Sequence, residues 1–210
     1  MTTSNTMPAE VEIESRAALR RWLERHHADS GSVWLILGKK CSGETAVGYD
    51  EVVDECLCFG WIDSRPGKVD ERRWKLRVSP RDPKSAWSGV NKRRVARLER
   101  EGLMTDAGRS LVDAAKRSGA WTFLDDVERL EIPDDLARAL DGTPGARDLF
   151  DRFPDSSKRG ILEWIKTAKR DETRAKRVRE TATKAAKNRK ANFPPGRDAG
   201  PALERGPRAS

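Results

Sequence analysis

The residues best suited to binding chemistry lie together in one run of the chain. Three cations, Arg77, Arg81 and Lys84, precede Ser85, at which a helix is expected to begin. A helix N-terminus exposes unpaired N–H groups and the positive end of the helix dipole, so it attracts anions. The run therefore predicts a site for a phosphate or a carboxylate. The alternative is that Ser85 is an ordinary N-cap and that Asp82 neutralises the arginines.

Two further residues extend this candidate site along the same helix. Trp87 and Asn91 are four residues apart, so both lie on the inner face that continues to Val95. An amide on an apolar face must find polar partners, and Asn91 either holds the neighbouring loop or lines a pocket. Asp63 is the expected acidic partner, which either orients Arg81 or contacts the ligand. The predicted ligand-binding residues are Asp63, Arg77, Arg81, Lys84, Ser85, Trp87 and Asn91.

A second group of arginines suggests a nucleic-acid partner. Arg93, Arg97 and Arg100 are spaced i, i+4, i+7 on the outer face of the same helix, and Arg174 and Arg177 belong to a later basic segment. Such stripes can lie along phosphates, although no exposed aromatics are interleaved and no helix-turn-helix pattern is present. The alternative is that both basic stretches are solvated helix faces.

Signatures of enzymes are missing from the sequence. It contains no P-loop, no GxGxxG, no HExxH and no GxSxG motif. The adjacent His26 and His27 point about 100° apart on a helix, so they are poorly placed to share a metal ion. We therefore expect no cofactor and no metal, and lean against an enzyme. Asp63 acting as an acid or base beside the same cations stays open as an enzymatic alternative.

Charge and composition narrow the class of protein. The 210 residues include 42 Lys and Arg against 34 Asp and Glu, but the charge is uneven: residues 68–100 hold 12 basic and 4 acidic residues, and residues 156–210 hold 16 and 6. No stretch is long and apolar enough to span a membrane. The first 14 residues lack the basic and apolar regions of a secretory signal. With three cysteines, a reduced cytoplasmic protein is expected.

Hydrophobic periodicity predicts an α+β fold that is predominantly helical. In the first part of the chain, a small antiparallel sheet from residues 32–37 and 72–78 is expected to pack against helices. The later part is expected to be helical and to end in one long basic helix. The expected organisation is a disordered leader at 1–8, an α+β domain at 9–124, a helical region at 125–190 and a disordered tail at 191–210.

Several motifs in order resemble the YdeI/OmpD-associated family, named for bacteriocin protection. These are Phe59-Gly60-Trp61-Ile62-Asp63-Ser64, Ser79-Pro80-Arg81, Ser85-x-Trp87-Ser88-x-x-Asn91, Gly102-Leu103-Met104-Thr105-x-Ala107-Gly108 and Trp164-Ile165-x-x-Ala168-Lys169-Arg170-x-Glu172-Thr173-Arg174. The resemblance covers about residues 12–190. It implies a role in stress or antimicrobial protection and carries no established reaction. The leading prediction is a non-enzymatic stress-protection or anion-binding protein, with nucleic-acid binding as the alternative and an uncharacterised enzyme as the second alternative.

Overall fold

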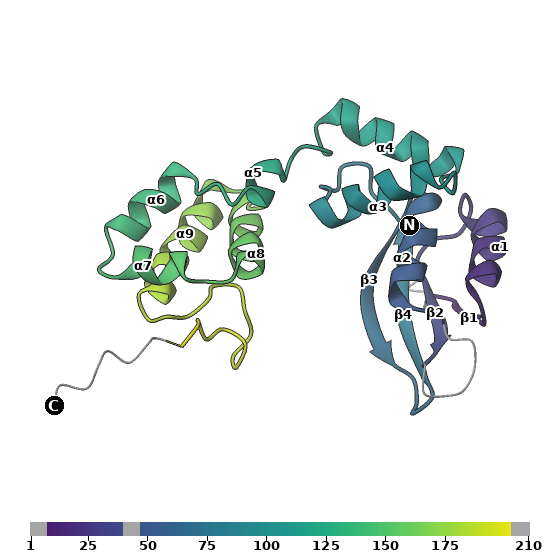
Figure 1. Cartoon of the computed structure of the whole chain (residues 1–210), viewed down its shortest axis with the longest axis horizontal. Coiled ribbons are helices and arrows are strands. Elements are labelled where there is room, and N and C mark those ends of the chain that lie inside the picture. The colour runs from purple at the N-terminus through teal and green to yellow at the C-terminus, as the bar shows by residue number, and fades with distance from the viewer. Residues whose placement is uncertain (1–7, 40–46, 203–210) are drawn as a thin grey trace, which may run out of the picture. The chain divides into compact units, whose positions relative to one another are not determined.

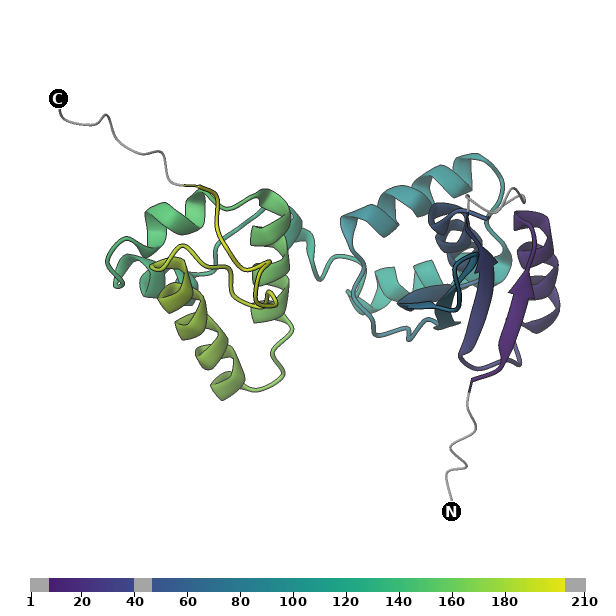
Figure 2. The same cartoon turned by 90° about the horizontal axis from the view of Figure 1, so that it is seen from below.

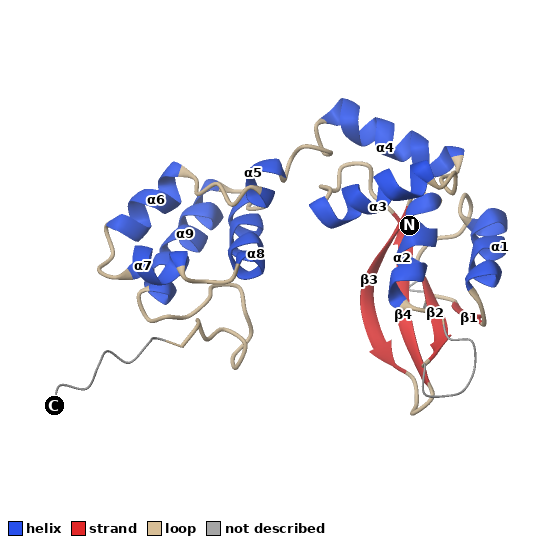
Figure 3. Cartoon of the chain, in the orientation of Figure 1, coloured by secondary structure: helices blue, strands red, loops and turns tan. Residues whose placement is uncertain are grey.

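The computed structural model describes residues 8–39 and 47–202 of the chain, which divides into two units at residues 123 and 124 (Figure 1). The predicted leader lies outside the described residues except for Pro8. The strands of the described residues all belong to the N-terminal unit (Figure 3). The elements of this unit are β1 (Glu10–Ile13), α1 (Arg16–His26), β2 (Val33–Gly38), α2 (Tyr49–Cys58), β3 (Trp61–Lys68), β4 (Arg73–Pro80), α3 (Gly89–Arg100) and α4 (Asp106–Ser118). The C-terminal unit contains α5 (Asp125–Glu128), α6 (Asp134–Asp141), α7 (Ala146–Asp151), α8 (Asp155–Lys166) and α9 (Asp171–Ala185). The α+β, mainly helical fold is confirmed.

The sheet has the order β1-β2-β4-β3 and is mixed, which corrects the prediction of an antiparallel sheet. β1 runs parallel to β2 (Figure 2), whereas β4 is antiparallel to both β2 and β3. The helix α1 connects β1 to β2, and a helical crossover is what allows neighbouring strands to be parallel. The sequence analysis expected sheet strands at residues 32–37 and 72–78 and did not identify β1.

Charged side chains of β1 reach across β2 to β4 on the open face of the sheet. Glu12 pairs with Arg73 at 3.0 Å and Glu10 pairs with Lys75 at 2.8 Å. Because these pairs cross over β2, Ile36 between them is buried even though it points to the open face. These two ion pairs help to hold the four-residue edge strand β1 in register.

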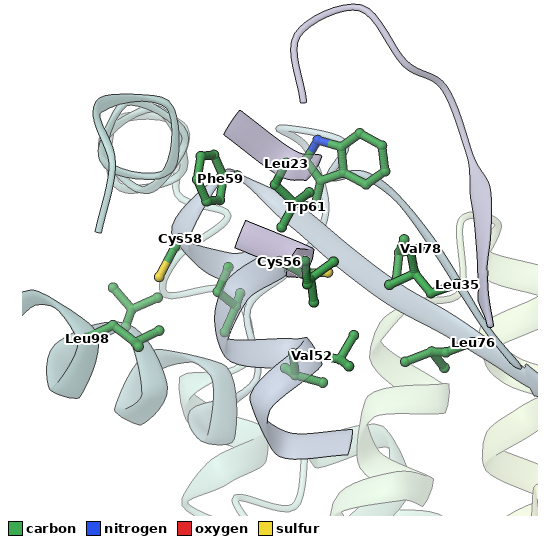
Figure 4. Close-up of a cluster of buried hydrophobic side chains, with 14 of the residues drawn as sticks. Leu23, Leu35, Val52, Cys56, Cys58, Phe59, Trp61, Leu76, Val78 and Leu98 are labelled. Atoms are coloured by element: carbon green, nitrogen blue, oxygen red, sulfur yellow. The ribbon is translucent and has the colours of Figure 1, made fainter. Parts of the chain in front are cut away.

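The other face of the sheet supports the core of the N-terminal unit. Val52 and Cys56 of α2 lie in the middle of this core (Figure 4). The sheet residues Leu76 and Val78 lie on one side of them, and Leu98 of α3 lies on the other. α2 is therefore a central helix, and its last residue meets α4. At that contact, a side chain on Gly108 would place its Cβ 2.3 Å from the carbonyl oxygen of the α2 terminus, so only glycine fits.

Two predicted helices begin or end elsewhere in the structure. α3 begins at Gly89 with Ser88 as its N-cap, rather than after Ser85, because residues 82–85 form a turn in which the Ser85 N–H donates to the Asp82 carbonyl at 2.9 Å. The long basic helix predicted at the end of the helical region is a hairpin of α8 and α9. It breaks after Lys166, where the Thr167 hydroxyl donates to the Glu163 carbonyl at 2.9 Å.

The structure describes the segment after α9 as far as residue 202, which covers part of the stretch predicted to be a disordered tail. Asp198 is 5% exposed, and its carboxylate accepts a hydrogen bond from Arg189 Nε at 2.7 Å. The backbones of Arg189 and Ala199 form an isolated antiparallel β-bridge. The backbone N–H of Gly200 donates to the Asn188 carbonyl at 2.7 Å. The sequence suggested disorder here because few residues are apolar. Polar and backbone contacts hold this segment instead. Residues 203–210 lie outside the described part.

Candidate functional site

Arg81 begins the connection between β4 and α3 and is the centre of the candidate site. Its backbone N–H donates to the carbonyl of Gly60 at 3.0 Å, which ties the end of β4 to the residue before β3. The residue is only 7% exposed. A cation buried to this extent needs compensating partners, because water no longer solvates it.

The guanidinium of Arg81 has fewer partners than its burial demands. It lies over the ring of Trp87 at 4.0 Å, and Nη2 donates to the carbonyl of Ala86 at 2.5 Å. Nε is buried and has no hydrogen-bond partner among the described residues. Burial lowers the pKa of Arg81 to about 10, while the nearby charge of Asp63 acts in the opposite direction. The arrangement leaves one N–H donor of a buried cation unused.

Trp87 fixes the guanidinium from one side. The indole is 1% exposed and packs against Trp121, with ring centroids 5.1 Å apart. The backbone N–H of Trp87 donates to the carbonyl of Ala120 at 3.3 Å. A buried, packed indole is a rigid platform for a cation. The indole therefore covers one face of the guanidinium.

Asp63 lies close to Arg81 and is held by a residue that the sequence did not indicate. The hydroxyl of Tyr49, at the start of α2, donates to Asp63 Oδ2 at 2.6 Å. Burial and the Asp63 carboxylate together raise the pKa of Tyr49 to about 12. No local pattern connects the two residues, which are 14 positions apart. The Tyr49 hydroxyl remains protonated at neutral pH and directs the carboxylate.

Four of the predicted ligand-binding residues have no hydrogen bond to the Arg81 guanidinium within the described part of the chain. Arg77 is exposed on the open face of the sheet and donates to Ser32 Oγ at 3.3 Å. The next residue of β4, Val78, faces the core. Lys84 and Ser85 are exposed in the turn before α3, and Asn91 is half-buried in its first turn. The structure thus brings together Asp63, Arg81 and Trp87, with Tyr49 added.

Two buried carboxylates of α2 form a second polar cluster that the sequence reading missed. Glu55 is 1% exposed and accepts from Arg16 Nε at 2.7 Å and from Arg20 Nη1 at 3.0 Å, both on α1. Asp54 accepts from Arg94 Nη1 at 2.9 Å and from Arg97 Nη2 at 2.5 Å, both on α3. Asp54 and Glu55 are adjacent acids in an otherwise apolar part of α2, and this pattern could have indicated buried carboxylates with basic partners. The cluster clamps α2 between α1 and α3.

Most of the arginines proposed for nucleic-acid binding have partners within the protein. Arg97 pairs with Asp54 and also with Glu101, at 3.1 Å. Arg174 pairs with Asp135 through two hydrogen bonds, and Arg177 lies over Trp164 and donates to its carbonyl oxygen. Arg93 and Arg100 are exposed. The predicted stripes therefore lose part of their charge to internal pairs.

No group of three or more His, Cys, Asp and Glu side chains is arranged to hold a metal ion within residues 8–39 and 47–202. Over the same part of the chain, the helices are too short or too polar to cross a bilayer.

Comparison with known protein families assigns each unit separately. Residues 129–188 match the family described as Bacteriocin-protection, YdeI or OmpD-associated. The C-terminal unit contains a YdeI/OmpD-associated domain. Residues 11–111 match a domain of unknown function (DUF8412), and the motifs between Phe59 and Gly108 lie in this stretch. The resemblance inferred over 12–190 is thus shown for the later part. No curated protein and no solved structure matches the chain.

The signature at the end of the YdeI/OmpD-associated domain has a structural role. Residues 164–174 comprise the end of α8, the turn at residues 167–170 and the start of α9. Arg174 joins α9 to Asp135 of α6 with distances of 2.7 and 2.9 Å, and Arg177 caps the end of α8 by donating to the Trp164 carbonyl. These contacts hold the α8–α9 hairpin of the domain on its neighbouring helix.

Proposed function

We propose that this protein is a non-enzymatic binding protein that recognises a small anion through Arg81. The observation that carries the proposal is the buried guanidinium, which is 7% exposed and has an unpaired Nε within the described part of the chain. An isolated buried charge is costly, and a buried donor without an acceptor adds to that cost. A carboxylate or phosphate oxygen at Nε would remove both costs.

The neighbouring side chains define how such an anion would bind. Trp87 covers one face of the guanidinium at 4.0 Å, so an anion would approach along an edge of the planar group, and contact with the buried Nε requires the side chains that cover it to move aside. Guanidinium recognises carboxylate and phosphate oxygens along this edge. Tyr49 holds the Asp63 carboxylate through a 2.6 Å hydrogen bond, which keeps it directed toward the phenol. The Asp63 carboxylate offsets part of the positive charge near Arg81, and Arg81 is the residue that would donate hydrogen bonds to the anion.

Thermal unfolding of the full chain with added anions tests the proposal. We expect sodium phosphate or sodium formate, compared with chloride at equal ionic strength, to raise the unfolding temperature. A ligand at 100 times its Kd stabilises by about 2.7 kcal/mol. Arg81→Lys keeps a charge but removes the planar fork and should abolish the increase. Arg77→Lys changes an exposed arginine of the same unit and should retain it.

A spectroscopic readout separates binding from a change in stability. The indole N–H resonance of Trp87 should shift with added phosphate or formate in the wild-type protein and stay fixed in the folded Arg81→Lys variant. An equal temperature increase in wild type and Arg81→Lys, or an unresponsive Trp87 resonance, would refute anion recognition by Arg81.

We also propose that the protein acts in the cytoplasm and contributes to protection against antimicrobial peptides. The support for this role is the family description of the YdeI/OmpD-associated domain at residues 129–188. Bacteria that express the full chain should survive a bacteriocin challenge better than cells with an empty vector, and the protein should fractionate with cytosol. Equal survival would contradict the protective role, whereas anion binding is measured separately on the purified protein.

A further inference from the structure

The open face of the sheet carries a tryptophan that leans across a neighbouring strand. Trp34 of β2 alternates with the buried Val33 and Leu35, so its side chain lies on the face away from the core. A Cβ on Gly67 of β3 would lie 3.7 Å from Trp34 Cζ3. β4 lies between β2 and β3 (Figure 3), and neighbouring strands are about 4.8 Å apart. The indole therefore lies along the sheet and reaches β3 at a residue that has no side chain.

Two arginines share a row of the sheet with Trp34. Arg77 of β4 is the register partner of Trp34, and a β-bulge in β3 places residues 64 and 65 together opposite Arg77. Because side chains alternate along a strand, Arg65 shares the face of Gly67, beside which the indole lies. Directly opposed residues have Cβ atoms about 5 Å apart. Arg65, Arg77 and Trp34 thus form one row across three strands.

This row keeps positive charge that the protein does not neutralise. The two acids that β1 contributes to the open face are each paired with a cation of β4, at 2.8 and 3.0 Å. Within residues 8–39 and 47–202, Arg77 donates to the hydroxyl of Ser32 at 3.3 Å and has no acidic partner. Over the same residues Arg65 is exposed and makes no hydrogen bond or ion pair. A polyanion is complementary to such a surface.

Lys75 determines which side of the indole a ligand can use. The indole begins opposite Arg77 and ends beside Gly67, which is opposite Lys75, so it crosses β4 between these two cations. Lys75 Nζ lies 4.8 Å from the centroid of the Trp34 ring, over one face, and pairs with Glu10 at 2.8 Å. A planar group must therefore stack on the other face, and this places it beside Arg77.

We propose that the row of Arg65, Arg77 and Trp34 binds single-stranded nucleic acid. A base stacks on Trp34 on the side of Arg77, and the two arginines pair with the adjoining phosphates. Aromatic side chains beside cations bind single strands in this way, because every base has a π-face and the cations follow the backbone. A duplex does not fit, since its bases are already stacked. The proposal goes beyond the anion contact of Arg81, because it uses other residues and requires a base as well as a phosphate.

Fluorescence anisotropy with labelled strands tests the ligand class on the full chain at low salt. Oligothymidylate and oligouridylate of about 12 nucleotides should bind with similar affinity, because the contacts are to base and phosphate and not to sugar. Two competitors should bind at least tenfold more weakly: the thymidylate strand annealed to oligodeoxyadenylate, and polyglutamate, which has charge but no bases. Failure of either single strand to bind, or equal binding of the duplex or of polyglutamate, would overturn the proposal.

Variants then locate the strand on the sheet. Trp34→Leu should weaken binding at least about fivefold, the lower limit for the loss of one stacked base, whereas Trp34→Phe should keep most of the affinity. Arg65→Gln combined with Arg77→Gln should make the plot of log K against log salt concentration shallower by about 1.4, since each phosphate contact contributes about 0.7. The matched control, Arg93→Gln combined with Arg100→Gln, removes the same charge from exposed positions of α3 and should leave the slope unchanged.

The same variants give the results that would refute the row. An equal change of slope in both double variants would mean that any surface arginine attracts the strand. Wild-type affinity in Trp34→Leu protein that is folded by circular dichroism would exclude stacking on Trp34. Arg81→Lys should bind both strands as the wild-type protein does, so this proposal and the anion contact of Arg81 can fail independently.

Discussion

Glu55→Gln is the substitution that most directly tests the clamp around α2. The side chain of Glu55 is 2% exposed and contacts two arginines of α1, at 2.7 and 3.0 Å. Glutamine preserves the shape and removes the charge. Arg16 and Arg20 would then face a neutral amide in place of a carboxylate, and the attachment of α1 to α2 would weaken.

The magnitude follows from how far the partners are buried. Breaking a fully buried ion pair costs about 3–5 kcal/mol. The side chains of Arg16 and Arg20 are 36% and 29% exposed, so water solvates part of their charge after the substitution. Surface pairs contribute about 1 kcal/mol or less. Between these limits, we expect Glu55→Gln to lower the free energy of unfolding by about 2–3 kcal/mol.

Urea unfolding of the full chain, followed by tryptophan fluorescence, measures this change. Six of the seven tryptophans precede residue 124, so the signal reports mainly on the N-terminal unit. Glu24→Gln is the matched control, because Glu24 lies 3.6 Å from Arg20 but its side chain is 52% exposed. It should cost about 0.5 kcal/mol or less. If the two variants lose the same stability, burial of Glu55 does not strengthen its ion pairs and the reasoning is wrong.

Three further substitutions or titrations probe other contacts. Gly108→Ala should destabilise the protein by about 3 kcal/mol in thermal unfolding, because its Cβ would lie 2.3 Å from a backbone oxygen of α2, whereas Gly31→Ala, with no atom within 4 Å, should change little. Tyr49 is the single tyrosine, so absorbance at alkaline pH should show one phenol ionising at about pH 12. Asp63→Asn should lower that midpoint while burial keeps it above 10. The stability contributed by neutral Tyr49 is complete below pH 10 and is lost as the pH rises toward 12; a midpoint near 10 in the folded protein would contradict the assigned contacts. The pKa of Asp135 is lowered, chiefly by its hydrogen-bonded arginine, so its contribution is present above pH 3.8 and is lost on acidification. Asp135→Asn should lower stability at pH 7 and reduce its pH dependence, measured by circular dichroism; an unaltered pH profile would count against the pair.

The sequence predicted those features that depend on neighbouring residues. Alternating polarity at residues 72–78 identified β4, and the helix expected to begin at Ser85 is α3, which begins at Gly89. The run around Arg81 also indicated the guanidinium and Trp87 that the structure brings together. The same alternation places Arg77 next to the buried Val78 in the strand, so Arg77 faces away from the core.

Contacts between distant residues were decided by the tertiary structure. Arg94 and Asp54 are 40 positions apart, and Tyr49 and Asp63 meet only because the start of α2 lies beside β3. The same holds for the parallel pairing of β1 and for the fold of α9 back onto α8. Local periodicity determines which face of each element is apolar, because it depends on backbone geometry alone. Which cation meets which carboxylate, and which donor remains unpaired, depends on how those faces pack together.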